Sequence, residues 1–112
     1  MYEDVKAQLH GRPRKKIANN TYLELITVTD EEYINMYLHG YNIATFTKNY
    51  IVLSSCGWHT RTTKNRLNMA LELAGLPYTI RIYQEKYTWY IGEFDYKFYD
   101  GMKVDYDGRV VS

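Results

Sequence analysis

The chain has 112 residues and a mass of 13.3 kDa, and 46% of its residues are hydrophobic, 24% charged and 16% aromatic. This length and composition exclude a disordered tail and predict one domain, residues 1–112, that buries roughly two thirds of its unfolded surface. The formal net charge is only +1, so the overall charge does not indicate a nucleic-acid or membrane partner. No apolar run reaches the roughly 18 residues of a membrane helix. We therefore expect no membrane partner and a cytoplasmic location.

Charge is distributed unevenly along the chain. The first sixteen residues contain a basic excess made of Lys6, Arg12, Arg14, Lys15 and Lys16. We predict that residues 1–16 form a basic, partly flexible N-terminal arm. No acidic residue occurs between Tyr33 and Leu71, whereas acidic residues outnumber basic ones from Glu72 onward. The domain is therefore predicted to be dipolar.

The first half of the chain shows strand patterns. Alternating side chains rich in β-branched residues predict a strand over residues 21–29. Shorter strands are predicted over residues 33–38, 43–46 and 50–54, because turn-forming segments at residues 39–40 and 47–49 separate them. These strands follow one another as in an antiparallel meander.

A helix and further strands are predicted in the second half. Leu67, Ala70, Leu71 and Ala74 share one helical face, and the glycine and proline at positions 75 and 77 end the helix. Strand patterns return at residues 78–83, 87–91, 94–99 and 102–106, with Asp-Gly turn signals at 100–101 and 107–108. We therefore predict an α+β fold, a curved antiparallel sheet of about six to eight short strands packed by one helix near residues 63–75.

Residues 57–68 lie where a strand ends and the predicted helix begins. Threonines at 60, 62 and 63 can cap the free amides of a helix start, and neighbouring basic residues add positive charge, which suits a phosphate. The predicted nucleic-acid or anion site consists of Arg12, Arg14, Lys15, Lys16, His59, Arg61, Lys64 and Arg66. The alternative is that the threonines cap the helix for structural reasons alone.

The chain has 13 tyrosines and 3 phenylalanines. Tyrosine suits a half-exposed sheet, a platform for stacked bases or a protein interface. Tyr33, Tyr37 and Tyr41 lie in the acid-free part and could stack bases. The predicted protein interface lies in the acidic third and consists of Tyr96, Tyr99, Asp95, Asp100, Asp105 and Asp107.

The sequence does not favour catalysis or a metal centre. Cys56 and His59 are close enough in sequence to meet, but no third residue completes a catalytic set, and the carboxylates are spread over turns. We predict no catalytic residue, no metal site and no cofactor. We expect His39 to be a structural histidine and Trp58 to pack in the core beside the helix start.

Four segments match a longer pattern. The chain follows K-x-A-N-N-T-Y at residues 16–22, L-H-x-T-x-I at 38–43, G-G-W-x-T-x-T-T-K-x-R-I-N at 56–68 and F-x-D-G at 98–101. It departs at Cys56 for the first glycine, at residues 40–41 after the histidine, and at Leu67 for isoleucine. With these segments the chain resembles a family of small bacteriophage proteins, and the resemblance implies a phage or prophage origin.

Two functions remain as hypotheses. The first is a non-enzymatic anti-defence inhibitor of the anti-CRISPR type, whose partner is a host CRISPR effector protein or its guide RNA/DNA channel. In that role either the acidic turns mimic phosphates or the basic face binds guide RNA. The second is a single-domain DNA- or RNA-binding module that uses the basic helix start and the tyrosines.

Overall fold

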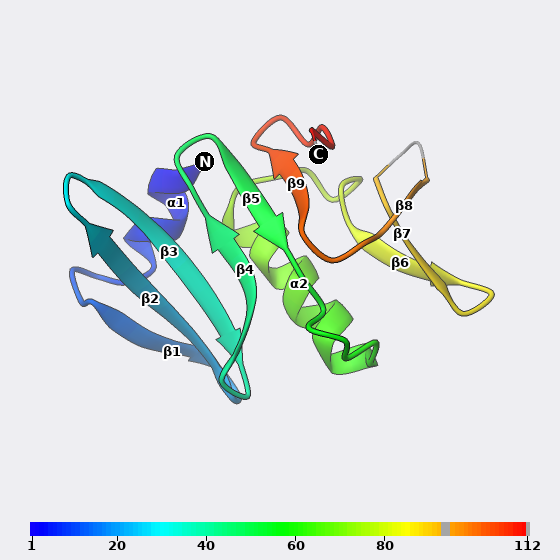
Figure 1. The fold of residues 1–112 in the computed structure, drawn as a ribbon, viewed down its shortest axis with the longest axis horizontal. Helices are drawn as coiled ribbons and strands as arrows, with labels where there is room; N and C mark the ends of the chain where they lie inside the picture. Colours follow the sequence, from blue (N-terminus) through cyan, green and yellow to red (C-terminus); the bar gives the residue numbers. More distant parts are fainter. Residues whose placement is uncertain (93–94, 112) are drawn as a thin grey trace.

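The structure, a computed structural model, describes residues 1–92 and 95–111 and has an α+β fold, as predicted. The described residues form two helices, α1 (Tyr2–Ala7) and α2 (Arg61–Leu73). The strands in chain order are β1 (Arg14–Ala18), β2 (Thr21–Val28), β3 (Glu31–Leu38), β4 (Tyr41–Phe46), β5 (Tyr50–Leu53), β6 (Ile82–Glu85), β7 (Thr88–Ile91), β8 (Tyr96–Lys97) and β9 (Met102–Asp105). Figure 1 shows them as two antiparallel sheets around α2.

The larger sheet has six strands in the order β1-β2-β3-β4-β5-β9. Its first five strands form the predicted meander, and tight turns join neighbours. His39 and Gly40, with φ values of 52° and 82°, form the turn between β3 and β4. Two successive positive φ values are typical of the type I′ turn, whose twist matches that of the strands it joins. Bulges interrupt the pairing of β1 with β2 and of β3 with β4.

Element boundaries differ from the predictions for local reasons. α2 begins at Arg61 rather than at residue 63, because the Thr60 hydroxyl accepts a hydrogen bond from the Thr63 amide and caps the helix. The strand predicted from residue 78 begins only at Ile82, since the chain first turns with an Ile80 amide bond to the Pro77 carbonyl. In the strand predicted over 94–99, only Tyr96–Lys97 are paired, and Phe94 lies outside the described residues.

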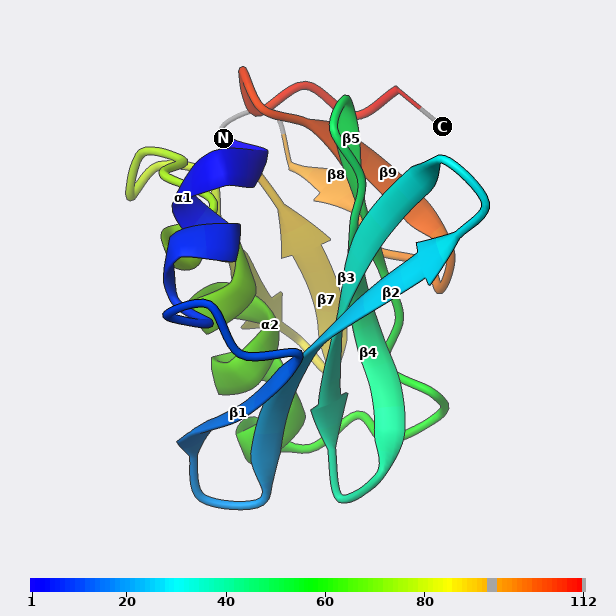
Figure 2. The ribbon, with the colours of Figure 1, turned by 90° about the vertical axis from the view of Figure 1, so that its left-hand side faces the viewer.

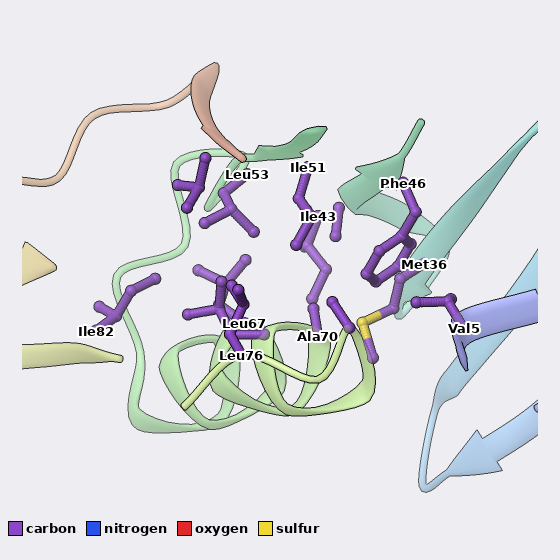
Figure 3. Packing of buried hydrophobic residues seen from close by; sticks show 14 of the residues in the cluster. Val5, Met36, Ile43, Phe46, Ile51, Leu53, Leu67, Ala70, Leu76 and Ile82 are labelled. Carbon is purple, nitrogen blue, oxygen red and sulfur yellow. The ribbon is translucent and has the colours of Figure 1, made fainter. Parts of the chain in front are cut away.

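The hydrophobic core lies between the six-stranded sheet and α2. Figure 3 shows Met36, Phe46 and Leu53 of the sheet directed toward Leu67 and Ala70 of the helix. The spacing of the buried helix positions gives α2 one apolar stripe, and the alternate strand residues supply the facing layer.

The second sheet consists of β6, β7 and β8 and lies beside α2, away from β1 (Figure 1). The Asn68 side chain of α2 pairs with the backbone of Ile82 in both directions. Its amide nitrogen donates to the carbonyl at 2.9 Å, and its oxygen accepts from the Ile82 amide at 2.6 Å. Ile82 itself is fully buried in the core. This polar pair and the burial of Ile82 therefore both help to fix the sheet against the helix.

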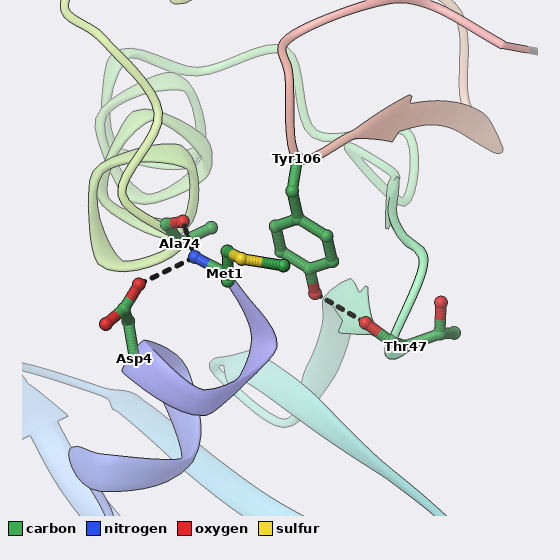
Figure 4. A network of polar contacts seen from close by, with 5 residues as sticks. All are labelled: Met1, Asp4, Thr47, Ala74 and Tyr106. Atoms are coloured by element: carbon green, nitrogen blue, oxygen red, sulfur yellow. Dashed lines mark hydrogen bonds and ion pairs between the residues drawn. The ribbon is translucent and has the colours of Figure 1, made fainter.

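The prediction of an N-terminal arm over residues 1–16 is wrong. Residues Tyr2–Ala7 form α1, and Tyr2, Val5 and Leu9 are buried in the core cluster. As Figure 4 shows, the amino group of Met1 bonds to the Ala74 carbonyl just beyond α2 and to the Asp4 carboxylate at 2.7 Å. Basic residues dominated the sequence pattern, but the three apolar side chains determine the packing.

Polar contacts reinforce the attachment of α1 to β3. The Tyr2 hydroxyl and the Lys6 ammonium donate to the two carboxylate oxygens of Glu32, at 2.7 Å and 3.1 Å. These two hydrogen bonds lower the pKa of Glu32. Burial and the bond to Glu32 raise the pKa of Tyr2. Both shifts favour the protonation states present near neutral pH, so the network stabilises the docked helix there.

Replacing Val5 tests whether α1 belongs to the core. Val5→Ala removes two buried methyl groups and is expected to lower the free energy of unfolding by about 2 kcal/mol. Urea unfolding followed by circular dichroism measures the change. Gln8→Ala, at an exposed position next to the same helix, is the control and should leave the midpoint nearly unchanged. If both substitutions had equally small effects on the free energy of unfolding, the prediction of a flexible N-terminal arm would be correct after all.

Candidate functional site

One end of the molecule brings together segments that are far apart in the sequence. We call it the hairpin end and define it by the turns at residues 19–20 and 39–40, residues 54–60 and the first turn of α2. These parts lie together at the lower end of the molecule in both Figure 1 and Figure 2. The His39 amide donates to the Asn20 carbonyl at 2.9 Å, and the Arg66 Nε donates to the Thr21 hydroxyl at 2.8 Å. The two hairpins and the helix are therefore directly bonded.

A groove of about 400 Å³ opens at the hairpin end. It is lined by Leu38, His39, Tyr41, Ile43, Ser55, Trp58, Thr60, Thr62 and Thr63. Leu38, Ile43, Ser55 and Thr63 are buried, whereas the other lining residues are exposed. The groove thus has a largely apolar base and a rim of aromatic rings, hydroxyl groups and one imidazole.

Trp58 is the largest exposed side chain on this rim, and its predicted place in the core is wrong. It is 53% exposed, and its ring centroid lies 6.0 Å from that of Tyr41, which is 49% exposed. The tryptophan in the core is Trp89, only 5% exposed and packed against Phe98 and His59. The preceding residues Cys56 and Gly57 both have positive φ and form a turn that brings Trp58 to the surface.

Asp100 fixes the turn that precedes Trp58. Its carboxylate accepts hydrogen bonds from the Ser55 amide at 2.7 Å and from the Ser55 hydroxyl at 2.8 Å. The Ser55 hydroxyl oxygen in turn accepts from the Gly57 amide, and the Ser55 carbonyl accepts from the Trp58 amide. Charge-assisted bonds of this kind are stronger than neutral ones. The backbone that presents Trp58 is therefore held in one conformation.

The start of α2 forms one wall of the groove. Thr60 caps the helix, and its hydroxyl lies 3.0 Å from that of Thr63. The first turn contains no acidic residue. Free amides at a helix start have a partial positive charge that no carboxylate of that turn offsets here.

The eight residues predicted as a nucleic-acid or anion site are only partly brought together. Four of them lie at or near the hairpin end: Lys16, Arg61, Lys64 and Arg66. Lys16 pairs with Tyr22, which follows Thr21, the residue bonded to Arg66. The three others belong to the first half of α2.

Of the other four members, His59 belongs to the hairpin end but stacks on a residue of the second sheet, and the other three lie elsewhere. Arg12 and Arg14 lie at the far end of β1, and the Arg14 guanidinium stacks on the Tyr22 ring at 4.6 Å. Lys15 pairs with Leu23, on the helix-facing side of the sheet. The His59 imidazole stacks on Trp89, with ring centroids 4.6 Å apart. The predicted set is therefore split by the fold.

The predicted protein interface is also divided. Asp100 precedes β9 and bonds to Ser55, whereas Asp105 ends the same strand and accepts from the Asp107 and Arg109 amides. Asp95 bonds to the Tyr83 hydroxyl. These contacts give Asp100 and Asp105 structural roles in turns, while Asp107, Tyr96 and Tyr99 remain exposed.

Within residues 1–92 and 95–111, no three His, Cys, Asp or Glu side chains are grouped so that they could bind a metal ion. The Cys56 thiol contacts the Asn42 carbonyl and the Ser54 hydroxyl. Neither of the two described helices combines the length and hydropathy needed to cross a bilayer.

The fold and the groove define a small α+β domain with an aromatic-rimmed site at one end of an antiparallel meander. The chain belongs to the Kyanoviridae Gp96 protein family, whose model matches residues 2–105. It is therefore a phage protein, which confirms the phage origin predicted from the resemblance. Searches of curated proteins and of solved structures return no match to the chain.

Sequence reasoning placed Tyr41 among possible stacking residues but missed Trp58 as a surface group and Asp100 as its support. The available signal was the Cys-Gly pair before Trp58, because a turn with positive φ can direct the next side chain outward. No comparable signal links Asp100 to Ser55, since 45 residues separate them and only the pairing of β5 with β9 makes them neighbours.

Removing the Asp100 carboxylate tests this support. Asp100→Ala leaves the Ser55 amide and hydroxyl without their acceptor and is expected to lower the free energy of unfolding by about 1–3 kcal/mol. Asp107→Ala is the matched control, because Asp107 is exposed and precedes a glycine as Asp100 does, but its carboxylate accepts no hydrogen bond within the described residues. Chemical denaturation of both variants measures the difference. A loss no larger than that of Asp107→Ala would show that Asp100 does not fix the turn.

Proposed function

We propose that this phage protein binds nucleic acid through the hairpin end and catalyses no reaction. The observation that supports this proposal best is the exposed Trp58, which follows a hydrogen-bonded turn and lines a groove whose surroundings contain Lys16, Arg61 and Lys64. Aromatic faces stack on bases, and basic side chains neutralise phosphates. The combination meets the two general requirements for binding a nucleic-acid strand.

The distribution of charge supports the same partner. Residues 33–71, which supply the groove and the first half of α2, contain no carboxylate. The neighbouring Asp100 is committed to two bonds with Ser55. The opposite end, with α1 and the turn between β2 and β3, contains the acidic residues Glu3, Asp4, Asp30, Glu31 and Glu32 (Figure 2). A polyanion would therefore be attracted toward the hairpin end and repelled from the other.

A binding role also agrees with the chemistry around the groove. Its polar rim consists of threonine hydroxyls and His39, while the neighbouring Cys56 thiol contacts a carbonyl and a hydroxyl group. Nucleophilic catalysis requires a nucleophile bonded to a base that a third group orients. The contacts of Cys56 give it no such base.

Salt dependence tests the proposal. Fluorescence anisotropy with labelled DNA and RNA oligonucleotides is expected to show binding that weakens steeply as salt rises. In the variant Arg61→Ala/Lys64→Ala, the slope of log K against log salt should be shallower by about 1–2, because up to two phosphate contacts are lost.

The matched control is Lys86→Ala/Lys97→Ala, which removes two exposed lysines of the second sheet. This control variant should keep the slope of the unmodified protein. No binding to any oligonucleotide at about 50 mM salt, where such contacts are strong, would refute the proposal.

A second candidate function is the anti-CRISPR type of inhibitor, which acts on a host nuclease complex. Its support is a group of tyrosines on or beside the second sheet, with Tyr78 80% and Tyr87 94% exposed and Tyr96 and Tyr99 also exposed. Tyrosine is enriched in the central contacts of protein interfaces. This surface lies away from β1, on the side of the molecule occupied by the second sheet (Figure 1).

Inhibition assays with a panel of CRISPR effectors test the second candidate. The protein is expected to form a complex with at least one effector in gel filtration and to abolish its DNA cleavage. Tyr87→Ala/Tyr96→Ala should weaken that complex at least tenfold if these rings make central contacts. Tyr41→Ala, which removes an exposed tyrosine of the groove, is the control and should still inhibit. A panel of effectors that all remain active would exclude this role.

A further inference from the structure

We infer that the groove at the hairpin end binds one unpaired nucleobase stacked on Trp58, so that the protein selects single-stranded over duplex nucleic acid. The inference rests on the proposed function and specifies its ligand. It follows from the size of the groove, the exposure and orientation of the Trp58 ring, and the cations close to the lining residues.

The size of the groove suits a single base. Its volume of about 400 Å³ lies near the lower end of the roughly 300–1,000 Å³ found for sites that enclose small molecules. The bases of a duplex are stacked on one another and present only their edges, so an aromatic side chain can stack on a base only when that base is unpaired. A groove of this kind therefore distinguishes single strands from duplexes.

Trp58 is prepared for stacking before any ligand binds. The rings of Trp58 and Tyr41 are inclined by 54°, so Tyr41 contacts the indole at a tilt and does not cover it as a parallel ring would. About half of the Trp58 surface remains exposed. Ser55 donates to Asp100 and accepts from the Gly57 and Trp58 amides, and these bonds hold the backbone below the ring. Little conformational freedom is lost when a base binds to such a platform.

Polar groups near the ring can contact the rest of the nucleotide. Thr62 and His39 are exposed on the rim and can bond to base edges or to sugar hydroxyls. Arg61 lies between the lining residues Thr60 and Thr62. Arg66, further along the same helix, is bonded to Thr21, whose strand partner is the lining residue Leu38.

Two cations of α2 therefore lie close to residues that line the groove. This arrangement favours a nucleotide strand over an apolar peptide as the occupant. An apolar side chain of a peptide would pack on the apolar floor of the groove, but it would leave Arg61 and Arg66 without an anionic partner. A strand places one base in the groove and its two flanking phosphates near Arg61 and Arg66. Charge complementarity and aromatic stacking thus act on the same ligand, and no carboxylate among the lining residues opposes it.

Tryptophan fluorescence tests the inference directly. The chain has 2 tryptophans, and Trp89 is buried, so an oligonucleotide should quench the emission of Trp58 alone. We expect oligo-dT or oligo-U to quench it, and a duplex of the same length to leave it unchanged. Trp58→Ala should weaken single-strand binding roughly 10-fold to 100-fold, whereas Trp58→Phe should retain most of the affinity.

The control variant is Tyr87→Ala, which removes another exposed ring from the second sheet and should bind as the unmodified protein does. Equal affinity for single strands and duplexes without quenching would overturn the inference and leave the proposed function in place. Unchanged binding by Trp58→Ala would also overturn it. Failure to bind any nucleic acid would refute both. The quenching measurement uses the unmodified protein, so it is informative even if a Trp58 variant does not fold.

Discussion

The main helix α2 is too short to cover one whole face of the six-stranded sheet. The rest of the structure depends on the elements that cover the remainder of that face. α2 has 13 residues and is therefore about 20 Å long, while six strands span about 24 Å across the sheet. The helix cannot cover the whole face. α1 fills one side through Tyr2, Val5 and Leu9, and the three-stranded sheet fills the other through Ile82 and Ile91. The core is complete only when all three elements pack together (Figure 2).

The outer face of the same sheet explains the presence of Tyr37. Within the described chain, hydrogen bonds cross three strands there: the Tyr37 hydroxyl donates to Glu24 and accepts from Asn35, whose side-chain oxygen accepts from Thr45. Tyr37 thus has a structural role on a half-exposed sheet. Of the three tyrosines predicted to stack bases, only Tyr41 lines the groove. Tyrosine content alone therefore could not locate the site, whereas the neighbours of each hydroxyl distinguish the two roles.

The sequence predicted the parts of the fold that repeat locally. Alternation in residues 21–29 and the apolar stripe of residues 67–74 each specify an element within one window, and both are confirmed. α1 was missed because a helix of six residues has too few turns to show a period, and its stability comes from contacts with distant residues such as Glu32. The position of Trp58 was wrong for the same reason. A buried and an exposed tryptophan look alike in sequence, and Trp89 occupies the place expected for Trp58.

Folding requirements account for most of the hairpin end but not for its rim. Asn20, Thr21, Ser55 and Asp100 each bond to another segment and join the two hairpins, the turn and the helix. Removing any of these bonds would loosen the fold. The Trp58 side chain makes no comparable bond within the part of the chain that the structure describes, and its exposure leaves a large apolar surface in contact with water. A folded chain gains no stability from exposing that surface. The bonds below Trp58 thus present a ring whose free energy of burial becomes available only when a ligand covers it. For this reason we propose this end of the molecule, and not another, as the binding surface.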